Sequence, residues 1–125
     1  MNPNVRSAYM NTSVTTANPQ RLLVMLYDRL LLDVQRGLAA QEARDFAAAH
    51  PHLIHAQDIV VELRSTLRVD AWEGGPALAS LYDWLQVQLV NANVKRDASI
   101  TADCLPVVES LTQTWHEAAG LAASA

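Results

Sequence analysis

The chain of 125 residues is poor in residues that turn the backbone, since it contains only four glycines and five prolines. Neither occurs between Gln20 and Arg36. A β-sandwich or barrel of this length needs a turn about every ten residues. The sequence therefore excludes an all-β fold.

Long apolar runs are also absent. The longest is the six-residue segment Leu22 to Tyr27, whereas a helix that spans a membrane needs about 18 apolar residues. The first fifteen residues are polar and have no apolar stretch of the kind found in secretory signals. A single cysteine, Cys104, cannot form an internal disulfide. We therefore expect a cytoplasmic protein with no membrane insertion.

Positive charge is sparse, with 9 Lys and Arg against 13 Asp and Glu and a net charge of -4. The only adjacent basic pair is Lys95-Arg96. Because nucleic-acid binding relies on clustered cations, we expect no nucleic-acid partner.

The residues that are abundant form helices, with 20 alanines and 17 leucines. Asn18-Pro19 marks the start of a first helix, and apolar residues recur at spacings of three and four in the segments that follow Asp45, Pro76 and the polar connection 95–99. The first of these helices should run to about Glu42. The sequence therefore predicts an all-α fold, an antiparallel up-and-down four-helix bundle.

Three parts are expected along the chain. Residues 1–17 form a flexible N-terminal arm or lid, with a short extra helix as the alternative, 18–120 form the bundle, and 121–125 a frayed tail. Pro51 either kinks the second helix or marks the start of its regular part. Gly37 costs the first helix about 1 kcal/mol relative to alanine.

The first helix carries more apolar residues than one core-facing stripe requires. Arg29, Asp33 and Arg36 share one narrow arc, and apolar side chains cover most of the remainder. The helix is then either buried centrally or roofed by the arm, or it offers a groove to a segment of a partner. Both readings stay open on the residues alone.

No set of residues in the sequence assembles an active site. The histidines at positions 50, 52 and 55, with Asp58 and Glu62, are the one candidate metal cluster, and a solvated polar face is the simpler interpretation. Cys104 lies on an apolar stripe and fits core packing. We expect neither enzymatic activity nor a cofactor or metal. The amides Gln57, Asn91 and Asn93 either fix bundle register or bind the backbone of an added segment, and the two asparagines would alternatively cap a helix end.

Four segments in order resemble the flagellar export chaperone family FliS. They are Ala8-Tyr9 with Asn11 and Val14 to Pro19, then Leu22 to Asp28, then Ala56 to Leu67, and finally Leu81 to Leu85 with Leu89, Ala92-Asn93 and Trp115. The resemblance covers most of the chain. Arg29 departs from it, because the family commonly has glycine after the Tyr-Asp pair.

The resemblance implies a non-enzymatic chaperone that binds the disordered C-terminal segment of flagellin in apolar grooves. Binding would prevent premature polymerisation and keep flagellin competent for the flagellar export apparatus. The matched motifs and the helical spacing together place seven residues in the client groove or its lid: Tyr9, Leu22, Leu26, Tyr27, Leu81, Tyr82 and Leu85. The alternative is a helical adaptor for another export component, such as the export gate, or for an assembly regulator. A weak homodimer also stays open.

Overall fold

The computed structural model describes residues 18–124, and the side chains of residues 18–120. Within this range the chain forms four α-helices, α2 (Pro19–Glu42), α3 (Phe46–Thr66), α4 (Gly75–Val94) and α5 (Ala98–Ser124). One 3-10 turn, η1 (Val69–Ala71), precedes α4, and the described range contains no strand. The expected arm and its Tyr9 lie outside the described residues. No helix in the described part of the chain is long and apolar enough to cross a membrane.

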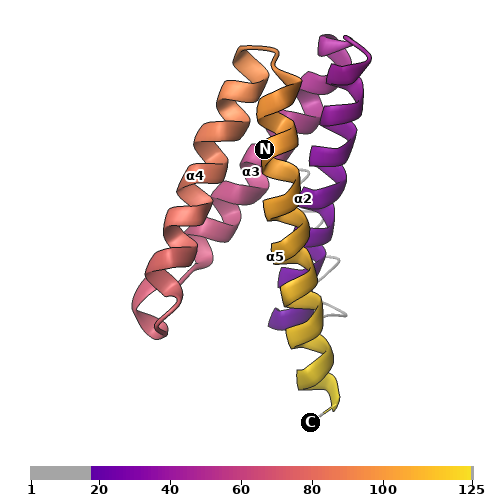
Figure 1. The fold of residues 1–125 in the computed structure, drawn as a ribbon. Coiled ribbons are helices and arrows are strands. Elements are labelled where there is room, and N and C mark those ends of the chain that lie inside the picture. The colour runs from indigo at the N-terminus through magenta and orange to yellow at the C-terminus, as the bar shows by residue number, and fades with distance from the viewer. Residues whose placement is uncertain (1–17, 125) are drawn as a thin grey trace.

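The helices follow one another around an antiparallel bundle (Figure 1). α2 packs against α3 and α5, and α4 packs against the same two helices, so α2 and α4 occupy one diagonal. Short connections between antiparallel neighbours produce this order. The predicted four-helix bundle is confirmed.

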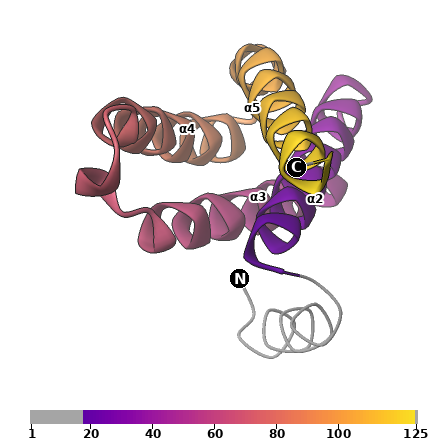
Figure 2. The same cartoon turned by 90° about the horizontal axis from the view of Figure 1, so that it is seen from below.

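The bundle differs at its two ends. At the turn end, where residues 43–45 join α2 to α3 and residues 95–97 join α4 to α5, the helices lie close together. Toward the open end, which carries residues 67–74, the α3/α4 pair diverges from the α2/α5 pair (Figures 1 and 2). α2 starts and α5 finishes on the side of the open end.

Local signals set the helix starts. The Asn18 side chain accepts a hydrogen bond from the Arg21 amide at 2.8 Å, and Pro19 follows it in the first turn. The Asp45 side chain likewise accepts from the Ala48 amide at 3.1 Å. α3 runs from Phe46 through Pro51 without ending there. The regular part of this helix thus begins before the proline.

One core cluster fills the bundle, and it draws on all four helices. Its fully buried members include Leu30 and Val34 of α2, Leu53 of α3, Leu89 of α4 and Val108 of α5. Gly37 explains one close contact, because a Cβ atom there would stand 2.8 Å from Cδ2 of Leu53. The glycine therefore lets α2 and α3 approach each other.

The arc of Arg29, Asp33 and Arg36 is not uniformly exposed. Arg36 is exposed, but Asp33 is fully buried. The Asp33 carboxylate contacts Nδ1 of His55 on α3, and Nε of Arg29 lies 3.2 Å from its other oxygen. A buried carboxylate needs such partners, so this arc supplies a polar link between α2 and α3.

Candidate functional site

A small apolar depression lies at the open end of the bundle, with a volume of about 160 Å³. Every helix contributes to its wall, and the loop that contains η1 closes one side. The lining residues are Leu23, Leu63, Thr66, Leu67, Arg68, Ala71, Trp72, Leu78, Tyr82 and Trp115. An apolar cavity of about 150 Å³ holds a benzene molecule. The depression therefore has room for one large apolar side chain.

Two of the lining residues, Tyr82 and Trp115, contact Tyr27, which does not line the depression itself. The hydroxyl groups of Tyr27 on α2 and Tyr82 on α4 are in hydrogen-bond contact. The Tyr27 ring also stacks on Trp115 of α5, with ring centroids 6.1 Å apart and planes at 17°. Burial raises the pKa of both tyrosines above the ordinary value of 10.0. Both hydroxyls are thus neutral, and they satisfy each other inside the bundle.

The predicted groove residues fall at three depths. Tyr27 and Leu85 are fully buried, and Leu26 is 7% exposed. Leu22 and Leu81 are half-buried. Tyr82 is nearly buried yet lines the depression, so it is the one member of the described set that the structure brings to this surface.

Sequence reasoning missed most of the residues that surround Tyr82. Leu63, Leu67 and Leu78 lie on the regular apolar stripes and read as core, while Trp72 sits in a loop with 52% of its surface exposed. Position on a stripe is the only signal that these leucines carried. The divergence of the two helix pairs determines which of the stripe leucines line the depression, and the sequence does not specify this divergence.

The candidate amides join α3 to α4. Gln57 donates to the Leu89 carbonyl at 3.4 Å, and the Asn93 side chain bonds to Nδ1 of His50. Asn91 is half-buried in the last turn of α4, where its carbonyl accepts from the Lys95 amide. Gln57 and Asn93 thereby link the α3/α4 pair along its length.

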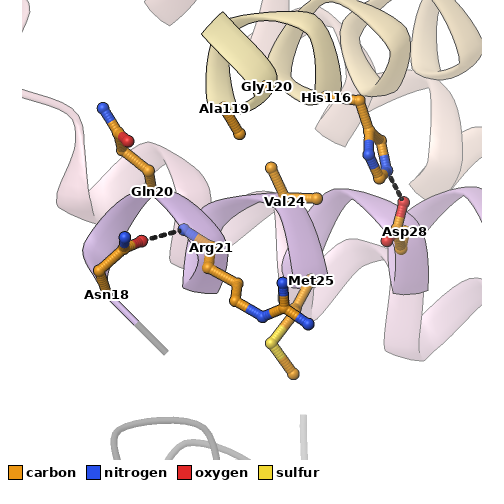
Figure 3. Close-up of a pocket in the computed structure, with 9 residues that line it drawn as sticks. All are labelled: Asn18, Gln20, Arg21, Val24, Met25, Asp28, His116, Ala119 and Gly120. Atoms are coloured by element: carbon orange, nitrogen blue, oxygen red, sulfur yellow. Dashed lines mark hydrogen bonds and ion pairs between the residues drawn. The ribbon is translucent and has the colours of Figure 1, made fainter. Parts of the chain in front are cut away.

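A second, more polar hollow lies beside the start of α2 and the last turns of α5 (Figure 3). His116 of α5 and Asp28 of α2 bridge it, with Nε2 2.6 Å from Oδ1. Val24 points toward α5 in the same view. Both members of the ion pair are about half exposed, so the pair is solvated and contributes little to stability.

Comparison with known proteins agrees with the resemblance seen in the sequence. The family model described as "Flagellar protein FliS" matches residues 1–122. The chain belongs to the FliS family. It is 33% identical to the flagellar secretion chaperone FliS of Bacillus subtilis (strain 168) over 115 residues, which cover 92% of this chain and 86% of the relative. It is also 25% identical over 111 residues to the flagellar secretion chaperone FliS of Vibrio cholerae serotype O1 (strain ATCC 39315 / El Tor Inaba N16961), covering 86% and 80% of the two chains.

The remaining chemistry-bearing residues of this FliS family member have structural partners. Between residues 18 and 124, no three His, Cys, Asp or Glu side chains come together as a metal site. Of the candidate cluster, His55 contacts Asp33 and His50 contacts Asn93. Cys104 is fully buried, and burial raises the pKa of its thiol to about 12. In the part of the chain that the structure describes, these side chains therefore form no metal-ligand group, and the thiol of Cys104 is enclosed by the core.

Proposed function

We propose that this protein is a cytoplasmic, non-enzymatic export chaperone whose client is the disordered C-terminal segment of flagellin. The bound segment cannot polymerise prematurely, and it stays extended for the flagellar export apparatus. Membership of the FliS family supports the chaperone role. The choice of client and of its seat is our own inference.

The observation that carries the proposal is the apolar depression at the open end. It combines four leucines, of which Leu23 and Leu67 are half-buried, with two tryptophans, and it lies at the end where the two helix pairs separate. A disordered client must overcome its own ordering entropy, so its seat should bury apolar side chains in preformed hollows. We therefore place an apolar anchor of the client in this depression.

In this proposal the predicted groove residues have different roles. Tyr82 contacts the client directly, while Leu22 and Leu81 lie on partly exposed surfaces that the client covers. Tyr27, Leu26 and Leu85 are buried and do not contact the client, but their packing holds the helices that form the seat in position. Gln57 and Asn93 keep the register of α4 against α3, while the Asn91 carbonyl accepts a hydrogen bond at the end of α4.

Calorimetric titration with a C-terminal flagellin peptide tests the seat. Trp72→Ala removes an exposed ring from the wall of the depression and should weaken binding about tenfold, because buried tryptophans dominate such interfaces. Trp84→Ala is the matched control, since Trp84 is 37% exposed on α4 and does not line the depression. Absence of heat with the unmodified protein, or equal losses in both variants, would contradict the proposal.

The N-terminal arm offers a second test. If residues 1–17 cover the seat in the free protein, a chain that begins at Asn18 should bind the same peptide more tightly, because the client no longer competes with Tyr9. Weaker binding would show instead that Tyr9 contacts the client. The Tyr9→Ala variant of the full chain separates the effect of this side chain from the effect of the arm.

A further inference from the structure

The turn end, on the opposite side of the bundle from the depression, carries two arginines that converge on one aromatic ring. Arg44 belongs to the α2/α3 turn and Arg96 to the α4/α5 turn, and they have positive φ angles of 60° and 52°. Their guanidinium carbons lie 5.8 and 5.7 Å from the centroid of the Phe46 ring. Such φ angles are uncommon outside glycine. In both turns the arginine therefore has a left-handed helical backbone conformation, and the two cations lie over the same ring.

The two guanidinium groups keep their hydrogen-bond donors available. Stacking on an aromatic ring uses the face of the guanidinium and leaves the N–H groups in its plane. With the described residues, neither group makes a hydrogen bond or an ion pair. Two carboxylates of these turns accept hydrogen bonds from backbone amides instead, Asp45 from Ala48 and Asp97 from Ser99. Charge-assisted donors thus face outward without an acceptor from these residues.

An apolar hollow adjoins these donors. It has a volume of about 550 Å³. Its apolar lining comes from Phe46, Ala47, Ala49 and Val94, and its polar lining from Gln41, His50, Asn93 and Arg96. Val94 is 74% exposed, the largest fraction among the exposed large apolar side chains of the described residues. The hollow can bind an apolar group of a ligand, and the two cations beside it can bind an anionic group of the same ligand.

A buried polar network holds this surface in place. Gln41 of α2 donates to the Ala92 carbonyl of α4 at 3.0 Å, and its side-chain oxygen accepts from the Thr101 hydroxyl of α5. At the surface, His50 of α3 and Asn93 of α4 add one more side-chain hydrogen bond between helices. A surface fixed in this way loses little conformational entropy when a partner binds.

We infer that the turn end is a second docking surface, which binds an acidic segment of a partner protein that carries an apolar side chain next to its carboxylates. The carboxylates pair with Arg44 and Arg96, for which a two-pronged geometry is available. The apolar side chain enters the hollow beside Val94. Nucleic acid fits less well, because the site is a pair of cations beside an apolar hollow in a chain of net charge -4.

Peptide titration of the full chain, followed by two-dimensional NMR of the ¹⁵N-labelled protein, tests the inference. The probe is acetyl-Gly-Asp-Leu-Glu-Leu-Asp-Gly-amide, and the control is the same peptide with Asn and Gln in place of Asp and Glu. We expect the acidic peptide to shift amides of residues 41–50 and 92–97 and to bind more weakly as salt is added. The amide peptide should produce no comparable shifts. Equal binding of the two peptides, or shifts spread over the whole surface, would overturn the inference.

Variants identify the groups responsible. The double variant R44Q/R96Q should lose about tenfold in affinity for the acidic peptide, equivalent to about 1.4 kcal/mol. R21Q/R36Q removes the same charge from exposed sites that lie outside both the turn end and the depression, and it should leave the affinity unchanged. V94S tests the apolar subsite at a position too exposed to affect folding. It should weaken binding without changing the salt dependence.

A flagellin C-terminal peptide provides the last arm of the test. It should leave the acidic peptide bound, because the client seat lies at the other end of the bundle. Displacement would overturn the inference, since the turn end would then be part of the client seat. Failure of the flagellin peptide to bind anywhere would count against the proposed function alone.

Discussion

The hydroxyl contact between Tyr27 and Tyr82 joins the two helices that face each other across the diagonal of the bundle. Neither residue is more than 2% exposed, so water has little access to the hydroxyls, and each is a hydrogen-bond partner of the other. Removing one leaves a buried donor or acceptor unpaired, which costs about 1–3 kcal/mol. The pair therefore fixes the floor of the depression in one geometry.

Tyr27→Phe should alter stability at high pH. In the folded protein the pKa of Tyr27 lies above its ordinary value of 10.0, so from about pH 10 upward the unfolded chain releases a proton that the folded chain keeps. The free energy of unfolding then falls with pH, by about 1.4 kcal/mol per unit for each such tyrosine. Urea unfolding between pH 9 and 11 should show a shallower fall for the variant. A slope equal to that of the unmodified protein would refute this account.

Because His55 contacts the buried Asp33, it should contribute more to the free energy of unfolding than an ordinary surface histidine does. His55→Ala leaves the fully buried carboxylate with Arg29 alone, so we expect the free energy of unfolding to drop by about 2 kcal/mol. The control is His116→Ala, which breaks a half-exposed pair with Asp28 and should cost at most about 0.5 kcal/mol. Denaturant unfolding near pH 6 measures both. Similar losses would show that burial of Asp33 is unimportant.

Single residues were the least predictable level of this molecule. Helical spacing placed Asp33 beside Arg29 and Arg36, but the partner that buries it, His55, lies on another helix. Tyr27 and Tyr82 were both singled out, yet the sequence held no sign that their hydroxyls meet. Such contacts depend on which helices become neighbours and on their relative height, which local patterns do not specify.

At the scale of elements, the α2/α3 hairpin depends on one small residue. Gly37→Ala improves helix propensity by about 1 kcal/mol, but the new methyl group would overlap with the buried Leu53 side chain and cost about 1–3 kcal/mol. We expect a net loss of about 1 kcal/mol in thermal or denaturant unfolding. Ala39→Gly, at an exposed site of the same helix, measures the difference in helix propensity between alanine and glycine without a change in packing. A more stable Gly37→Ala variant would show that Leu53 can move aside.

The helices themselves were predictable because their signals are local. Asn18 followed by Pro19 marks the start of α2, and Asp45 caps α3, as the side-chain hydrogen bonds confirm. Pro51 was ambiguous because its cost depends on how many turns precede it. Here the helix begins five residues earlier, at Phe46, and tertiary packing of the buried Ala49 and Leu53 on either side of Pro51 sustains it.

For the whole molecule, the divergence of the two helix pairs predicts uneven hydrogen exchange. Amides at the turn end, where Gln41 links α2, α4 and α5, should exchange more slowly than amides of 66–74 and the first turn of α4. Addition of the flagellin peptide should protect mainly the second group. Mass spectrometry of deuterated fragments measures both patterns, and uniform protection along the bundle would contradict the proposed seat.

The start of α2 and the last turns of α5 share the hollow bridged by His116 and Asp28. Because α5 finishes on the side of the open end, a flexible linker attached after α5 would leave the bundle on the side that carries the depression. A client segment tethered in this way would experience a local concentration in the millimolar range, far above what free peptide usually provides. The placement of one helix end thus offers a route to a single-chain complex in which even a weak client stays bound.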